Sequence, residues 1–205
     1  MNYTDVSQMP GFKVDAKGQN IIETLRSKIS ASQATQSLRF SDTNGDLDVI
    51  LVDGTIYLRG GANTLVFALG FPATTGPSWS GKWISISQND SQFAEIAPTL
   101  TYESNLDPFL PTGTITVKTN QQVHGQDATI LSGNSAPTGT IVKGTTTLYI
   151  DPTTKLPLGA TVQAVDSKKH TILEVVTFTS FGDPVQAVAP TGATPIATAI
   201  GTSAP

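Results

Sequence analysis

Residues 145–190 constrain the fold of this chain more than any other stretch, because strand patterns and turn chemistry agree along the whole segment. Three parts of it are rich in β-branched and apolar residues, as strands are, namely 147–150, 160–165 and 170–179. Asp151-Pro152 with Leu156-Pro157 separates the first two, since proline has no N–H to donate to a ladder, and the polar residues 166–169 separate the last two. The segment therefore predicts three consecutive antiparallel strands.

The last of these strands is largely apolar on both faces. One face carries Ile172, Glu174, Val176 and Phe178, and the other carries Leu173, Val175, Thr177 and Thr179. Such a strand either has two covered faces or turns one face towards an apolar ligand. This choice decides whether the protein has a filled core or a binding cavity.

Composition narrows the class of protein. The chain has 205 residues, enough for one domain with a substantial core, and 14% charged residues with 18 Gly and 13 Pro indicate an all-β or α+β exported protein with many turns. There is no cysteine, which excludes disulfides, thiolate metal sites and cysteine nucleophiles. A net charge of −4 without a run of Lys or Arg argues against nucleic acid and against a basic membrane-binding patch. No apolar run reaches the length of a transmembrane helix, and no signal peptide follows Met1.

The first third of the chain predicts a leader, a helix and a strand meander. Residues 1–18 show no periodicity and indicate a flexible leader. Asn20 is a possible N-cap for a helix over residues 20–29, whose apolar positions are Ile21, Ile22, Leu25 and Ile29. Three strands follow between residues 38 and 59, because Asn44-Gly45 and Asp53-Gly54 are typical of two-residue hairpin turns.

The middle of the chain alternates short elements with loops. A Gly- and Pro-rich loop carries Phe71 and Trp79, which are either packed into the core or cover an opening. A strand over 82–87, a short helix after Asn89 or Ser91, and a helical turn at 106–111 follow. Further strands are expected at 114–118, 122–132 and 138–143. The Ala-, Pro- and Thr-rich residues 191–205 are expected to be disordered.

Candidate catalytic and metal-binding groups are few. His124 and His170 have no neighbouring carboxylate at a useful spacing, and no G-x-S-x-G motif is present, so we expect neither an enzyme nor a cofactor. The acidic residues 42–48 are similar to a calcium loop, but Gly45 stands at its fourth position instead of the sixth. A hairpin turn with exposed acids explains the same residues, so no metal is expected.

Two motifs of the central segment carry a family resemblance. The first is YIDPTTKLP, with Ile150, Asp151, Thr154, Leu156 and Pro157, and the second is FTSFGDPVQAVAP, with Phe178, Phe181, Gly182, Pro184, Val185 and Pro190. With VDGTIYLR at 52–59 and GKWISIS at 81–87, they resemble the lipid-carrying lipoproteins of the LppX and LprG group, relatives in fold of the periplasmic lipoprotein chaperones. The resemblance covers roughly residues 20–190.

This resemblance implies an α+β fold for residues 19–190, in which a strongly curved antiparallel sheet, an open half-barrel, wraps around a few helices and encloses an apolar cavity. It implies non-catalytic binding and transport of a lipid or acylated molecule in the cell envelope, outside the cytoplasm. Members of the group are membrane-anchored by acylation of an N-terminal cysteine. Since this chain has neither that cysteine nor a signal peptide, we expect it to be a shortened form to which Met1 was added.

The cavity candidates are aromatic and aliphatic residues of the predicted elements and of the aromatic loop, which the resemblance assigns to the cavity. They are Leu25, Ile56, Leu65, Phe67, Phe71, Trp83, Ile150, Val176 and Phe178. The alternative is a structural or surface interaction lipoprotein whose half-barrel is filled by its own side chains, in which case the same residues form an ordinary core.

Overall fold

The computed structural model describes residues 3–4, 23–40, 46–69, 71–73, 76–136, 141–166, 169 and 171–201. The strands are β1 (Tyr3–Thr4), β2 (Glu23–Ile29), β3 (Ala34–Phe40), β4 (Leu47–Val52), β5 (Thr55–Gly60), β6 (Ile84–Ser87), β7 (Thr112–Val123), β8 (Gln126–Asn134), β9 (Ile141–Ile150), β10 (Pro157–Asp166), β11 (Thr171–Phe178) and β12 (Thr194–Pro195). The α-helices are α1 (Ala62–Leu69), α2 (Gly76–Trp79), α3 (Ser91–Ile96), α4 (Tyr102–Leu106) and α5 (Ile196–Ala199), and the 3₁₀ helices are η1 (Ala97–Leu100) and η2 (Asp107–Phe109).

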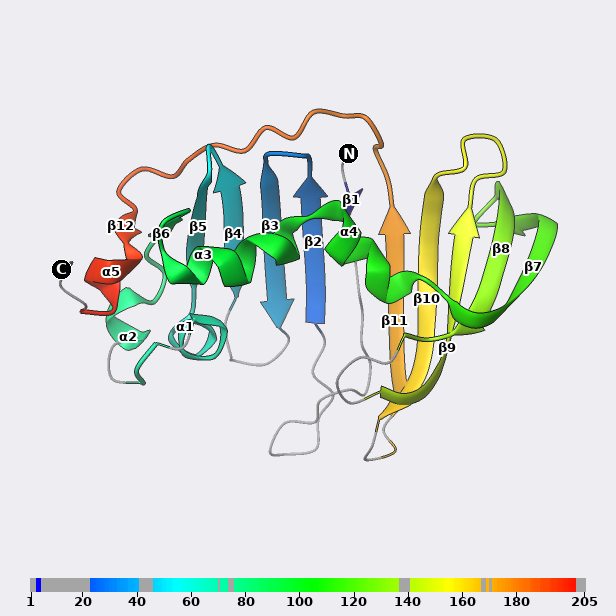
Figure 1. Cartoon of the computed structure of the whole chain (residues 1–205), viewed down its shortest axis with the longest axis horizontal. Helices are drawn as coiled ribbons and strands as arrows, with labels where there is room; N and C mark the ends of the chain where they lie inside the picture. The colour runs from blue at the N-terminus through cyan, green and yellow to red at the C-terminus, as the bar shows by residue number, and fades with distance from the viewer. Residues whose placement is uncertain are drawn as a thin grey trace.

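The strands form two six-stranded sheets that stand side by side (Figure 1). One sheet has the order β12-β6-β5-β4-β3-β2 and the other has the order β1-β11-β10-β9-β8-β7. All neighbours pair antiparallel except β12 and β6, which are parallel. The short β1 lies between β11 and β2, where the two sheets meet (Figure 1). We call this boundary the seam.

The three-strand prediction for the central segment is confirmed by β9, β10 and β11, which are consecutive and antiparallel. In the β9–β10 turn the Asp151 carboxylate accepts hydrogen bonds from the amides of Thr153 at 2.7 Å and Thr154 at 3.0 Å. These two amide bonds are the main reason that the pKa of Asp151 lies below its usual value. Pro157 is the first residue of β10 and not part of the turn, a position that tolerates a missing N–H.

The meander prediction is also confirmed, by β3, β4 and β5. Asp53 and Gly54 have φ angles of 50° and 68°, so both central residues of this turn are in the left-handed region that a type I′ hairpin requires. The helix expected at residues 20–29 is wrong, because residues 23–29 form β2 and pair with β3. Pairing with a β-rich neighbour outweighs the weak helical pattern, and Asn20 lies outside the described residues.

The long β7–β8 hairpin differs from the shorter strands that were expected. Asn120 lies between the strands expected at 114–118 and 122–132, but in the structure it is inside β7. Its φ angle is 55°, next to a shift of register that marks a bulge. The real turn is His124-Gly125, with φ angles of 50° and 80°. Gly133 continues β8 instead of ending it, so the ladder is longer at both ends than the turn residues suggested.

Residues 91–109 form a chain of short helices that runs across one face of the strands, as the green ribbon of α3 and α4 shows in Figure 1. We call this segment the helical strap. Pro98 and Pro108 stand in the first turns of η1 and η2, where a missing N–H costs nothing, and they divide the strap into short pieces. The Thr101 hydroxyl caps α4 by accepting the Ser104 amide at 3.2 Å. The short helix and the helical turn expected here are confirmed.

The face under the helical strap carries two separate apolar cores. The N-terminal core is built by β2–β6 with α1, α3, η1 and α5, and its buried residues are Ile29, Ala34, Val49, Ile56, Leu58, Leu65, Phe71, Ile84, Ile86, Leu100, Ile196 and Ala199. The C-terminal core lies on β9–β11 under η2, and its buried residues are Phe109, Leu148, Ala160, Val162, Ala164, Val176 and Phe178.

Residues 191–201 are ordered in the structure, contrary to the expectation for the chain beyond Pro190. After β11 the chain runs along the edge of the strands and returns to the N-terminal core (Figure 1). There β12 pairs with β6, and α5 buries Ile196 and Ala199, which are 2% and 3% exposed. Burial of Ile196, with Ile200 packed against the same core, offsets part of the ordering entropy of a segment of low hydrophobicity.

The architecture is α+β, with extensive, mostly antiparallel sheets and a few short helices, as predicted at that level. The sheets form no closed barrel among the described residues. No helix in this part of the chain is long and apolar enough to cross a membrane.

Candidate functional site

Three of the predicted cavity residues lie together in the N-terminal core. Ile56 and Leu65 are 0% exposed and Phe71 is 2% exposed, so all three side chains are packed against protein. Phe71 follows α1 and belongs to the core, which rules out the role of a cover that its loop position allowed. Trp79 packs partly buried against the same core, with the Lys82 Nζ 5.2 Å from its ring centroid.

Three others lie together in the C-terminal core. Val176 is 2% and Phe178 is 4% exposed, and Ile150 packs against them while partly buried. The Phe178 ring meets the Phe109 ring of η2 edge to face, with centroids 6.4 Å apart. Val176 and Phe178 therefore show which face of β11 is the inner one.

Of the remaining three candidates, the structure describes only the side chain of Trp83. Trp83 is half-buried, and the Arg59 guanidinium lies 4.7 Å from its ring centroid. Arg59 projects from β5 on the side opposite the buried Leu58, which places Trp83 with it on the outer face of the sheet. Leu25 lies on β2, in register with Leu38, and Phe67 lies on α1, but both side chains are outside the described part of the structure.

The helical strap is held by one buried residue at each core. Leu100 of η1 is 2% exposed in the N-terminal core, and Phe109 of η2 is 7% exposed in the C-terminal core. Between them α4 has no buried residue, although Tyr102 packs against one core and Leu106 against the other. Burial is also the main reason that the pKa of Tyr102 lies above its usual value. Since its two buried anchors are in different cores, the strap spans both of them.

Polar groups on β2 and β3 lie under this span. The Gln36 amide nitrogen is 3.4 Å from both the Thr99 carbonyl and the Asn105 Oδ1, which are weak contacts at the limit of a hydrogen bond. Ser27, in register with Gln36, is 1% exposed, and its hydroxyl has no partner among the described residues. A buried hydroxyl without a partner costs about 1–3 kcal/mol, so this position is suited to a polar group of a ligand or to a water molecule.

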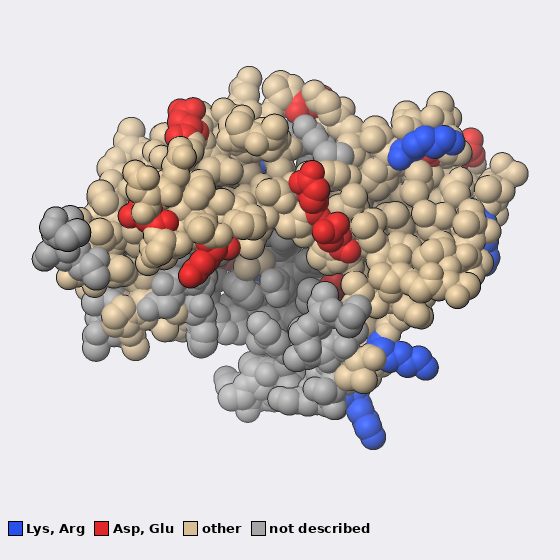
Figure 2. All heavy atoms as spheres, in the orientation of Figure 1, with Lys and Arg blue, Asp and Glu red and all other residues tan. Residues whose placement is uncertain are grey.

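The surface of the helical strap is acidic. Its residues include Glu95, Glu103 and Asp107 and no Lys or Arg. Figure 2 shows Asp and Glu side chains spread over this face of the molecule, while the Lys and Arg side chains lie towards the side of the C-terminal sheet. Such a surface disfavours docking of anionic lipid headgroups or nucleic acid on the strap.

A second polar feature lies on the outer face of β3, β4 and β5. Asp48 accepts one hydrogen bond from Arg39 at 2.6 Å, one from Arg59 at 2.7 Å and one from Ser37 at 2.9 Å, beside a hollow of about 400 Å³. Burial alone would raise the pKa of Asp48, but these three bonds outweigh it and hold the pKa below 3.8. Because the two arginines are matched by Asp48 and Asp46, the cluster stabilises the sheet and offers little free charge to an anion.

This cluster predicts acid sensitivity. The stability that ionised Asp48 contributes is fully present above its unfolded pKa of about 4 and is lost as the pH falls through its lower folded pKa. We expect Asp48→Asn to cost about 1 kcal/mol at pH 7, because the arginines are partly solvent-screened, and to cost less at pH 2.5. Urea unfolding at both pH values measures this. Asp46→Asn, at an exposed carboxylate, is the control with a small cost at both, and parallel pH curves for parent and Asp48→Asn would refute the role of Asp48.

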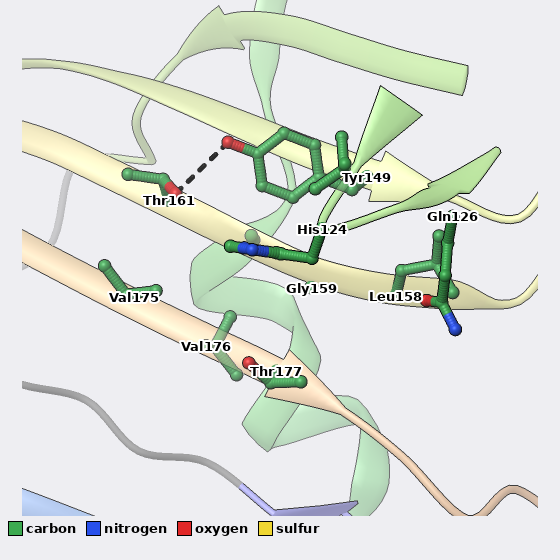
Figure 3. Close-up of a pocket in the computed structure, with 11 residues that line it drawn as sticks. His124, Gln126, Tyr149, Leu158, Gly159, Thr161, Val175, Val176 and Thr177 are labelled. Atoms are coloured by element: carbon green, nitrogen blue, oxygen red, sulfur yellow. Dashed lines mark hydrogen bonds between the residues drawn. The ribbon is translucent and has the colours of Figure 1, made fainter. Parts of the chain in front are cut away.

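A pocket with both apolar and polar walls lies on the outer face of the C-terminal sheet (Figure 3). Gly159 stands in register with Tyr149 on one side and Thr177 on the other. Residues in register share a face, so a position without a side chain is flanked by an aromatic ring and a hydroxyl. The result is a hollow of about 350 Å³.

The β7–β8 hairpin closes one end of this hollow. Pairing of β8 with β9 begins only at Thr129, so the preceding residues extend beyond the end of β9. Val123, His124 and Gln126 from the hairpin tip line the pocket, and Figure 3 shows the His124 imidazole beside Gly159. Neither the turn at His124 nor the role of Gly159 was expected from the sequence. The available signal was Gly125, because glycine is favoured in left-handed turns.

No group of three or more His, Asp or Glu side chains is close enough to hold a metal ion in the described part of the chain. His124 is exposed at a hairpin tip. His170 and residues 42–45 of the acidic segment 42–48 lie outside the described residues.

Comparison with known proteins gives no assignment: no protein-family profile matches the chain, and no curated protein is significantly similar to it.

Proposed function

We propose that this protein is a non-catalytic carrier of a lipid or acylated molecule outside the cytoplasm, as its resemblance to the LppX and LprG group implies. In this proposal the two sheets act together as one open half-barrel. The acyl chain lies between the helical strap and the inner face of the strands, near the seam and over the C-terminal core. No cofactor or covalent step is required.

One observation carries the proposal, namely the way the helical strap is anchored. Leu100 and Phe109 fix its two halves to different cores, while α4 between them has no buried residue. The Ser27 hydroxyl beneath this span has no partner among the described residues. A segment fixed at two points can lift between them without unfolding either core. That is what entry and exit of a long apolar ligand need.

The energy of acyl burial is sufficient for such a carrier. Each CH₂ group that leaves water contributes about 0.8 kcal/mol, so a long chain supplies on the order of 10 kcal/mol before ordering costs. The C-terminal core is the better place for it, because among the described helices only η2 and Leu106 of α4 pack there. The N-terminal core is covered by α1, α3, η1 and α5, joined by Trp79 of α2 and Tyr102 of α4, and its candidates are 0–2% exposed.

That tight packing favours a second candidate function for the same fold. Ile56, Leu65 and Phe71 are packed as in an ordinary core, which supports a structural or interaction protein that binds partners through its surface. The two functions differ in one measurable respect, since only a carrier takes up an apolar ligand stoichiometrically.

The test is ligand uptake by the two variants of neighbouring residues on β11. Val176→Gln places an amide on the inner face, which should cost about 1–3 kcal/mol of ligand binding, a weakening of about 5- to 150-fold. Val175→Gln changes the outer face, where the side chain is 38% exposed, and should leave uptake nearly unchanged. Delipidated protein titrated with N-phenyl-1-naphthylamine gives the affinities, and circular dichroism confirms that each variant is folded.

Native mass spectrometry of the parent protein makes the test independent of the folding of Val176→Gln. We expect one lipid-sized mass on protein purified without delipidation, and its loss after extraction. A parent that carries no such mass and binds no fluorophore refutes the carrier and favours the filled-core protein, as does equal uptake by both folded variants.

A further inference from the structure

We propose that the outer-face pocket between Tyr149 and Thr177 binds the ring of a neutral carbohydrate. This site is distinct from the lipid-binding face and does not depend on the proposed carrier function. The row Leu148-Ala160-Val176 on the same three strands belongs to the C-terminal core, whereas the adjacent row Tyr149-Gly159-Thr177 points the other way.

The polar groups of the pocket select the chemical class. They are the Tyr149, Thr161 and Thr177 hydroxyls, the Gln126 amide and the His124 imidazole. None of the lining residues is Asp, Glu, Lys or Arg, so the pocket holds no permanently charged side chain to pair with an ionised ligand. Hydroxyls and amides both donate and accept, which matches the hydroxyls of a sugar. An acyl chain in the same place would leave these groups unpaired.

The shape of the pocket favours a ring with one apolar face. Tyr149 offers an aromatic surface on one wall, its hydroxyl lies 3.3 Å from the Thr161 hydroxyl, and Val175 and Thr177 form the opposite wall (Figure 3). Pyranose rings present C–H groups on one face and hydroxyls at their rim, which is the complement of this arrangement. About 350 Å³ is near the lower end for ligand pockets and suits one or two such rings.

Gly159 keeps the floor of the pocket open. A Cβ atom at this position would lie 2.5 Å from the Val176 carbonyl oxygen, so no other residue fits without a shift of the strands. Glycine is therefore required at the middle position of this three-strand row, and no side chain from that position fills the hollow.

The conformation of His124 is a second, independent observation. It occupies the first central position of a type I′ turn with a φ angle of 50°, a position that usually carries Asn, Asp or Gly. Histidine at this position makes the turn less stable than Asn or Gly would. Its ring lies beside Gly159 in the pocket (Figure 3). Residues held in less favourable backbone conformations are common where a side chain contacts a ligand.

The experiment uses the full chain and a panel of neutral oligosaccharides of glucose, galactose, mannose and N-acetylglucosamine, with a sulfated oligosaccharide and a neutral nucleoside for comparison. Titration followed by NMR should move the resonances of Tyr149, Thr161 and Thr177 with at least one sugar. His124→Asn keeps the hairpin, since Asn-Gly is the preferred pair for this turn, but removes the imidazole. Thr177→Val keeps the shape and removes a hydroxyl. Each should weaken binding by about 3- to 10-fold.

Gln163→Ala is the matched control, because Gln163 is exposed on the outer face of β10 but does not line the pocket. It should bind within about twofold of the parent, and saturating N-phenyl-1-naphthylamine should not displace the sugar. The proposal is overturned if no sugar moves these resonances, if only sulfated sugars or neutral nucleosides do, or if His124→Asn and Thr177→Val both bind like the parent.

Discussion

Replacing Ile196 with alanine is expected to lower the free energy of unfolding by about 2–5 kcal/mol, the range for a fully buried large aliphatic side chain. Ile196 is 2% exposed in α5 and packs into the N-terminal core from a segment that is mostly Ala, Thr, Pro and Gly, with Ile200 as its other large apolar residue. Its loss removes the main apolar contact that holds the segment against β6. For a chain of this size the melting temperature should fall by on the order of 5–20 °C.

Val188→Ala is the control within the same segment, since Val188 is 76% exposed and should change stability by less than about 0.5 kcal/mol. Urea unfolding of both variants decides the question. Equal, small effects would mean that α5 does not contribute to the N-terminal core in solution. Only the large, selective effect of Ile196→Ala agrees with the structure.

The second large effect is expected at Phe178, whose replacement by alanine should cost about 3–5 kcal/mol. Phe178 is 4% exposed and meets Phe109 edge to face, so it joins β11 to the end of the helical strap. Thr177→Ala, at the next position on the outer face, should cost no more than about 0.5 kcal/mol because Thr177 is exposed.

A double-mutant cycle with Phe109→Ala tests the contact itself. The pair should show a coupling of about 0.5–1.5 kcal/mol beyond the burial of each ring. Additive effects would place the strap apart from β11. Phe109→Ala also frees one anchor of the strap, so in a carrier it should speed exchange of N-phenyl-1-naphthylamine in stopped-flow measurements, whereas a filled core has no such exchange to speed.

Turn chemistry determined much of the sheet structure directly. Asp53-Gly54 and the segment from β9 to β11 were predictable, because left-handed turn residues and proline act locally and do not depend on the rest of the chain. The helical turn at Phe109 was predictable because prolines bound it, and the strand-rich class was predictable from composition. The family resemblance and its lipid ligand remain predictions.

Other elements depended on contacts distant in sequence. Residues 23–29 carry a pattern compatible with a helix, and only pairing with β3 makes them a strand. Trp83 was placed in the cavity from its apolar character, but its packing against Arg59 is on the outer face. The C-terminal segment looks disordered by composition, yet the free edge of β6 and a gap in the N-terminal core order it through Ile196.

The sequence by itself therefore determined the local turns, the strand-rich class and the absence of cysteine chemistry, since these follow from each residue and its immediate neighbours. Only the tertiary structure decided the two cores, the span of the helical strap and the Tyr149-Gly159-Thr177 row. The physical reason is register: a shift of one residue in β10 would exchange its two faces and remove the glycine from between the tyrosine and the threonine.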